Sequence, residues 1–196
     1  MNRRLCLQGL ALSCLAPALA RAQPADAGAA LDALRRGGGG LVVAMRHALA
    51  PGTFDPPGFQ PGVCSTQRNL SDEGREQARR VGAWYRERGL VPTAVRSSEW
   101  CRCLDTARLA FGAAEPWPAL NSIVRERSTA TAQTQRLRDE LARRALADVR
   151  GFEVWVTHQV NISALAGSST GSGEAWLLRH DPARAELVVV GPLSVA

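Results

Sequence analysis

The chain has 196 residues and a net charge of +6, and all of its positive side chains are arginines. This length suits one domain with a sizeable core and is too short for two comfortable ones. Arginines alternate with acids along the predicted helices, which is typical of solvated helix faces. A nucleic-acid-binding protein would show a basic stripe with aromatic residues between the charges, so we expect no nucleic-acid partner.

Residues 1–22 have the pattern of a signal peptide. Arg3 and Arg4 precede a mostly apolar stretch over residues 5–19, and Ala20-Arg21-Ala22 suits cleavage. The stretch is interrupted and too short to span a bilayer, so we expect no stable membrane insertion. The expected location is the periplasm or the exterior. Two alternatives are weaker than ordinary secretion. One is recognition of the arginine pair by a twin-arginine system, and the other is a poor lipobox at Cys14.

Residues 23–40 are predicted to be a flexible linker. They contain a short helical piece followed by four glycines, Gly37–Gly40. A strand follows the glycines instead of a helix with a P-loop lysine, so we do not expect a phosphate-binding loop there. The predicted domain spans residues 41–196.

From residue 41 onward, predicted strands alternate with predicted helices. A helix after residue 71 has Ser71 as N-cap and Gly89 at its C-terminal end. The expected strands are 41–45, 93–98, 152–158, 175–180 and 186–193, the last two able to pair as a hairpin, and the other expected helices are 100–111, 129–149 and 159–167. This order indicates an α/β fold, a three-layer α/β/α sandwich with a mostly parallel central sheet.

Four charged or titratable residues fall at the junctions between strands and helices. Arg46 and His47 end the first strand, His158 ends the strand over 152–158, and Arg102 lies in the first helical turn after the second strand. Ligands of such sheets bind beyond the carboxyl ends of the strands. Two arginines there suit a dianionic phosphoryl group, and a histidine between them can attack phosphorus. A protonated His158 would be a further donor to the phosphoryl oxygens.

Cysteines and histidines leave two further questions. Cleavage would leave Cys64, Cys101 and Cys103, and we expect a disulfide from Cys64 to one of the other two. A metal site built from His47, His158 and His180 is a weak alternative because no local ligand spacing supports it and the arginines would face a cation. We expect no metal and no organic cofactor.

Four motifs carry a family resemblance. MRH, RNLSDEG, SSEWCRCLDTA and VTH follow one another in this order between about residues 41 and 167. Together they resemble the histidine phosphatase superfamily, which has the phosphoglycerate-mutase-like fold. The resemblance implies that His47 is the nucleophile and that Arg46 and Arg102 clamp the phosphate. It also implies that His158 is the second histidine of the pocket and that Arg68 and Asn69 reach the substrate.

The chain departs from the family pattern in its proton donor. Mutase-like members carry an acid where this chain has Ser122. The first candidate for a replacement is Glu174, which follows a glycine-rich turn, and Glu99 and Asp55 are the alternatives. Two smaller departures are Ala48, in place of a glycine, and Gln159 after the second histidine. The missing acid argues against mutase activity.

The predicted function is hydrolysis of a phosphate monoester through a phosphohistidine on His47. The expected partners are a small-molecule phosphate ester or a phosphate or sulfate anion. The long proline-rich loop over residues 48–67 is expected to cover the site and to help select the substrate. The alternative is a pseudophosphatase that binds a phosphate ligand and has lost turnover together with the acid.

Overall fold

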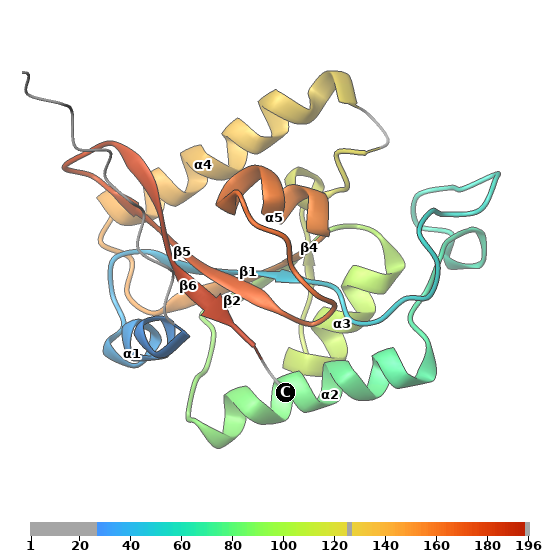
Figure 1. Ribbon diagram of the computed structural model, residues 1–196, viewed down its shortest axis with the longest axis horizontal. Helices are drawn as coiled ribbons and strands as arrows, with labels where there is room; N and C mark the ends of the chain where they lie inside the picture. Colours follow the sequence, from blue (N-terminus) through green and yellow to red (C-terminus); the bar gives the residue numbers. More distant parts are fainter. Residues whose placement is uncertain (1–26, 125–126, 195–196) are drawn as a thin grey trace, which may run out of the picture.

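A six-stranded sheet forms the centre of the computed structural model, which describes residues 27–124 and 127–194 (Figure 1). The strand order is β3-β2-β4-β1-β5-β6. The strands are β1 (Leu41–Arg46), β2 (Ala94–Ser97), β3 (Glu115–Pro116), β4 (Phe152–Thr157), β5 (Ala175–Asp181) and β6 (Glu186–Leu193). The first four strands are parallel to one another, and β5 and β6 form an antiparallel hairpin. The mostly parallel sheet and the closing hairpin are thus confirmed, and the short edge strand β3 was not predicted.

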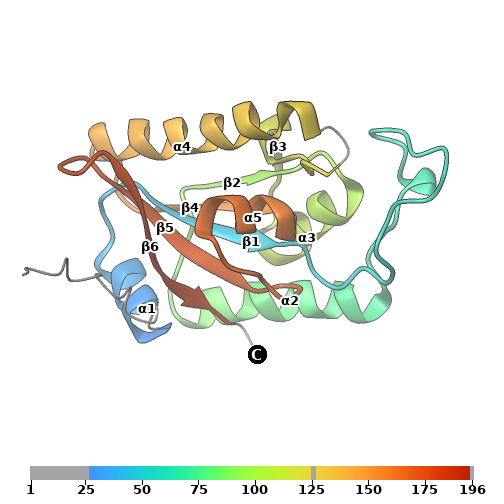
Figure 2. The ribbon, with the colours of Figure 1, turned by 45° about the horizontal axis from the view of Figure 1, so that its top comes forward.

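Helices cover both faces of the sheet (Figure 2). They are α1 (Ala27–Arg36), α2 (Asp72–Glu87), α3 (Cys101–Phe111), α4 (Ala130–Leu146) and α5 (Gln159–Ala166), with short 3-10 turns η1 (Cys64–Thr66), η2 (Pro118–Leu120) and η3 (Arg127–Thr129). Apolar side chains of α1, α2 and α3 join one core cluster, and those of α4 and α5 join the other. The predicted three-layer α/β/α sandwich is confirmed. None of the described helices is long and apolar enough to cross a membrane.

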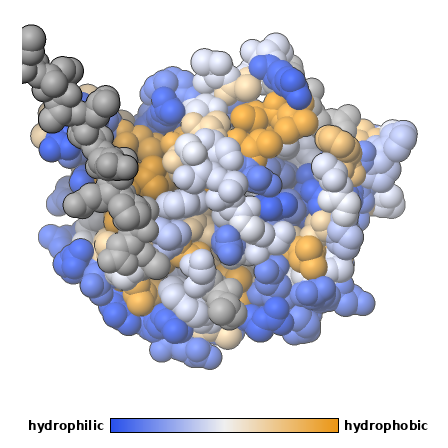
Figure 3. Space-filling view, viewed as in Figure 1, coloured by the Kyte–Doolittle hydropathy of each residue, from blue (hydrophilic) through white to orange (hydrophobic). Residues whose placement is uncertain are grey.

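Residues 48–67, which we call the covering loop, extend beyond the end of β1 and contain η1. Figure 3 shows the face of Figure 1 in a space-filling view. The covering loop lies at the right, and hydrophilic residues lie between it and the rest of the molecule. The start of α2 packs closely under the loop. A side chain at Gly74 would collide with the carbonyl oxygen of Leu49, so only glycine permits this approach. As predicted, Ser71 caps α2 by accepting a hydrogen bond from the Gly74 N–H at 3.1 Å.

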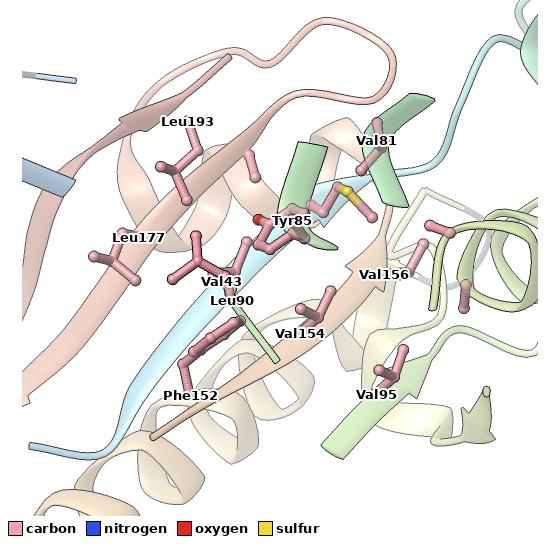
Figure 4. Close-up of a cluster of buried hydrophobic side chains, with 14 of the residues drawn as sticks. Val43, Val81, Tyr85, Leu90, Val95, Phe152, Val154, Val156, Leu177 and Leu193 are labelled. Carbon is pink, nitrogen blue, oxygen red and sulfur yellow. The ribbon is translucent and has the colours of Figure 1, made fainter. Parts of the chain in front are cut away.

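The strand β1 is buried on both faces, which explains its continuous apolar run. Val43 and Met45 point into the cluster under α2, whereas Val42 and Ala44 point into the cluster under α4. Tyr85 of α2 is fully buried and lies close to Val43 in the first cluster (Figure 4). Because both layers hold β1, the direction of its C-terminal end is fixed.

The linker predicted over residues 23–40 contains a docked helix. Ala30 and Leu34 of α1 are buried in the core cluster, and α1 lies against β6. These two residues are four apart and therefore share one helix face. All four glycines from Gly37 to Gly40 have positive φ, and they form the turn that leads into β1. The predicted signal peptide, residues 1–22, lies outside the described residues.

Candidate active site

A pocket of about 640 Å³ lies at the carboxyl edge of the parallel strands. It brings together five of the residues predicted from the sequence: Arg46, His47, Arg68, Arg102 and His158. They come from the ends of β1 and β4, from the first turn of α3 and from the segment before α2. Crossovers between parallel strands deliver these distant segments to one edge, as the topology requires.

His47 is a neutral imidazole with one free nitrogen. Its Nδ1 lies 2.7 Å from the carbonyl oxygen of Ala48. Because a carbonyl can only accept, Nδ1 carries the proton and Nε2 keeps its lone pair. Burial, and next the charges of Arg102, Arg68 and Arg46, lower the pKa of His47 to about 3 against the opposing effect of the Ala48 hydrogen bond. The imidazole is therefore an available nucleophile at neutral pH.

Three arginines surround this nucleophile. Arg46 donates from Nη1 to the carbonyl oxygen of Thr170 at 2.8 Å, and Arg68 donates to the carbonyl oxygen of Ala50. The Nε atoms of Arg46, Arg68 and Arg102 are each buried without a hydrogen-bond partner in the described part of the chain. Buried unpaired donors are uncommon in folded proteins. The positive charges of the three arginines that line the pocket beside His47 suit it to an oxyanion.

Asp55 of the covering loop holds Arg102 in place. Its carboxylate accepts hydrogen bonds from Arg102 Nη1 at 2.7 Å, the Arg68 backbone N–H at 3.0 Å and Trp100 Nε1 at 3.1 Å. Burial alone would raise the pKa of Asp55, but the hydrogen bond from Arg102 and the other donors lower it. Asp55 is therefore ionised and positions the Arg102 guanidinium from the pocket wall.

His158 forms the second wall of the pocket, with its ring centroid 5.6 Å from that of His47. Its Nδ1 lies 3.5 Å from Nη2 of Arg102, which can only donate, so Nε2 carries the proton and faces Ser98 Oγ at 2.9 Å. Burial, followed by the charge of Arg102, lowers the pKa of His158 well below its usual value. His158 is therefore neutral in this structure, which differs from the protonated donor expected beside a phosphoryl group.

Three other candidates do not line the pocket. Glu174 is exposed, and its Oε2 accepts from the backbone N–H of Gly171 at 2.8 Å. Burial lowers the pKa of Arg46, and the charge of Glu174 only partly opposes this. Glu99 accepts from Asn121 Nδ2 at 2.7 Å. Asn69 donates to the carbonyl oxygen of Cys64 at 2.7 Å and so fastens the covering loop. Of the three acids considered from the sequence, only Asp55 lies in the pocket.

The three described cysteines form one disulfide and one buried free thiol. Cys64 and Cys101 form a disulfide, which ties the covering loop to the residue before Arg102. Cys103 is free, and burial raises the pKa of its thiol to about 12. A protonated, buried thiol is a poor nucleophile. Among the described residues, no group of three His, Cys, Asp or Glu side chains could hold a metal ion, so His180 does not join the two pocket histidines.

Sequence reasoning missed two residues that orient the pocket. Ser98 bonds to His158, and its Oγ also donates to Asn121 Oδ1 at 3.2 Å. Asn121 in turn accepts from the backbone N–H of Glu99 at 2.9 Å. Ser98 directly follows β2, so the rule that placed Arg46 and His158 at the sheet edge could have found it. Asn121 lies in a turn after η2 and carries no such local signal.

Comparisons with known proteins agree with this architecture. The structure resembles the protein histidine phosphatase SixA in complex with tungstate, with a TM-score of 0.57 and 14% identity over 79% of this chain and 96% of the other. It also resembles mycobacterial glucosyl-3-phosphoglycerate phosphatase with VO3 (TM-score 0.55, 17% identity, 76% and 96% covered). A third similar structure is phosphoglycerate mutase from Bacillus anthracis (TM-score 0.57, 12% identity, 76% and 91% covered).

At these identities, the structural likeness establishes the fold. No sequence with a curated description matches the chain. The model of the histidine phosphatase superfamily (branch 1) matches residues 45–151, which is more than half of the chain and includes His47, Arg68 and Arg102. The chain therefore belongs to branch 1 of the histidine phosphatase superfamily.

Proposed function

We propose that the protein hydrolyses a phosphate monoester through a phosphohistidine formed on His47. One observation carries the proposal: a neutral imidazole with a free Nε2 shares one pocket with three arginines, whose charges act on it. Phosphoryl transfer requires mainly alignment and neutralisation of the charge on the phosphoryl oxygens. These residues supply both.

In the first step, Arg46, Arg68 and Arg102 bind the dianionic phosphoryl group, and Nε2 of His47 attacks the phosphorus. An N–P bond forms while the P–O bond to the alcohol breaks, and its electron pair leaves with the ester oxygen. The bound dianion offsets the arginine charges that disfavour a positive imidazole. The hydrogen bond from Nδ1 to the Ala48 carbonyl oxygen then stabilises the phosphorylated ring.

In the second step, water attacks the phosphohistidine. The N–P bond breaks, His47 recovers its neutral form, and inorganic phosphate leaves with the oxygen and one proton of the water. The other proton of the water passes to the solvent and balances the proton that the leaving alcohol oxygen takes up. His158 forms the side wall beside the reacting histidine, with its ring held by Ser98 and Arg102.

No protonated carboxyl group lines the pocket within the described residues, because Asp55 is ionised and Glu174 lies outside. The leaving oxygen must then take its proton from water. We therefore expect esters of acidic alcohols, such as phenols, to react faster than esters of simple aliphatic alcohols. The same observation favours the second candidate function, a pseudophosphatase that binds a phosphate ligand without turnover.

The test is hydrolysis of phenyl phosphate in the presence of a chelator, with release of inorganic phosphate as the readout. We expect turnover by the wild type and none by His47→Ala. The matched control is Arg108→Ala, which removes an arginine of α3 that does not line this pocket and should retain full activity. Binding of inorganic phosphate by a wild type that shows no turnover would support the pseudophosphatase instead.

We also propose that the protein is exported to the periplasm or the exterior. The Cys64–Cys101 disulfide supports this, because disulfides persist in oxidising compartments. Cell fractionation followed by mass spectrometry tests the proposal: we expect a mature chain that starts near residue 23 with one free thiol. A full-length cytoplasmic chain with three reduced thiols at Cys64, Cys101 and Cys103 would contradict it.

A further inference from the structure

The pocket is larger than its phosphate-binding end. A volume of about 640 Å³ lies in the range of sites that enclose a whole organic ligand. A phosphoryl group between the arginines would fill only the deep part. The outer part must therefore receive the group that the phosphate esterifies.

Apolar side chains gather at the mouth of this outer part. Among the described residues, five large apolar side chains are exposed: Phe54, Val63, Val91, Val124 and Leu146. Two of them, Phe54 and Val124, line this pocket although they lie 70 positions apart in the chain, and Val160 of α5 adds a third apolar side chain. An exposed apolar cluster at the rim of a ligand pocket marks a binding surface.

Phe54 is held at the rim by its neighbour. It is 76% exposed, whereas the side chain of Asp55 is only 8% exposed and is bonded to Arg102. The backbone at Phe54 is thereby fixed beside the arginine that receives the phosphate. The ring is exposed to solvent in the protein alone. A ligand with an apolar part would cover it, and burial of the ring would stabilise the complex.

The charges of the pocket are concentrated at its deep end. Arg46, Arg68 and Arg102 contribute +3 and Asp55 contributes −1, so the charged lining sums to +2, equal and opposite to a phosphate dianion. The other described lining residues, including the two neutral histidines, carry no charge. A second anionic group on the substrate would find no described countercharge in the outer part and would lose its hydration.

From these observations we infer that the substrates are phosphate monoesters whose alcohol part is uncharged and largely apolar, with Phe54 and Val124 as the side chains that select it. The inference rests on the proposed function and specifies its substrate class. On this inference, small acidic esters, such as phosphorylated hydroxy acids, are poorer substrates than apolar esters.

The test compares three aryl phosphates whose phenols have nearly the same pKa of about 10. They are phenyl phosphate, 4-propylphenyl phosphate and the charged analogue 4-(2-carboxyethyl)phenyl phosphate. We expect kcat/KM for the propyl ester to exceed that for the carboxyethyl ester by at least about ten-fold, with phenyl phosphate below the propyl ester. In Phe54→Ala the preference should fall to about three-fold or less. Val63→Ala, on the same loop but outside the pocket, should keep it.

Binding of the corresponding aryl phosphonates, measured by calorimetry, separates the inference from the proposed function. Hydrolysis of all three esters with equal kcat/KM would overturn the inferred substrate class and leave the phosphatase intact. No hydrolysis, with tighter binding of the propyl phosphonate that depends on Phe54, would overturn the phosphatase and retain the ligand class. No hydrolysis and equal phosphonate binding would overturn both.

Discussion

The deep end of the pocket and the covering loop are held by different forces. His47 and His158 follow strands that are buried on both faces, so the packing of two core layers fixes them. The covering loop contains only one short 3-10 turn. Besides the stacking of Phe59 on Trp100, it is fastened by the Cys64–Cys101 disulfide and by side-chain bonds of Asp55 and Asn69. The chemistry is thus built on the rigid sheet, whereas the surface that would select the substrate depends on a few specific bonds, each of which can be removed singly.

Removal of the disulfide should give the largest loss of stability. The two cysteines are 37 residues apart, and the entropy of closing such a loop corresponds to about 4 kcal/mol. The double variant Cys64→Ser/Cys101→Ser should lose roughly this free energy of unfolding in urea titrations, and reduction of the wild type should have the same effect. A loss below about 1 kcal/mol would show that the loop is held without the disulfide.

At the deep end, Arg46→Ala should lower kcat/KM for phenyl phosphate by about 10²- to 10³-fold, or roughly 3 to 4 kcal/mol of transition-state stabilisation. No carboxylate among the described residues pairs with Arg46, so this variant leaves no described acid buried and unpaired. Arg108→Ala is again the control. A decrease of less than about ten-fold would contradict a clamping role for Arg46.

Asp55 connects the two regions. Both side chains of its ion pair with Arg102 are less than 10% exposed, so Asp55→Ala should destabilise the fold by about 3 kcal/mol because it leaves a buried guanidinium unpaired. The matched control is Asp105→Ala, which breaks the partly exposed pair with Arg75 and should cost less than about 1 kcal/mol. Chemical denaturation measures both. Equal losses would show that the Asp55 pair is no stronger than a surface pair.

The pH dependence of stability should reveal the neutral His47. Its pKa is about 3 in the folded protein and about 6.5 when unfolded, so the unfolded state binds the extra proton between these values. Stability must then fall as the pH falls below about 6.5, by up to about 1.4 kcal/mol per pH unit for this residue. His47→Gln should show a shallower decline between pH 6 and 4 in urea titrations. Parallel curves would mean that His47 is protonated in the folded protein.

Sequence patterns identified the parts of the molecule that local rules control. The apolar run of β1 and the cap at Ser71 predicted their elements, and the positions of His47 and His158 at strand ends predicted their meeting. The bonds of Asp55 could not be predicted, since its partner Arg102 lies 47 residues away across a loop without periodicity. The neutral state of His158 in this structure could not be predicted, because burial and neighbouring arginines depend on the assembled pocket.

The docking of α1 was missed for a related reason. Its two inward residues, Ala30 and Leu34, are too few to distinguish a packed helix from a linker with helical propensity. Glu174 was chosen because it opens a strand near the site, but its carboxylate bonds to the turn at Gly171 instead. Position along a strand predicts which edge a residue reaches, and the local hydrogen-bond donors decide where its side chain goes.

The most direct test of the account is detection of the phosphohistidine. Wild-type protein mixed with a radiolabelled aryl phosphate and quenched within milliseconds should carry label that is stable to base and labile to acid, and peptide mapping should place it on His47. Label that is absent from the wild type, or undiminished in His47→Ala, would contradict the account.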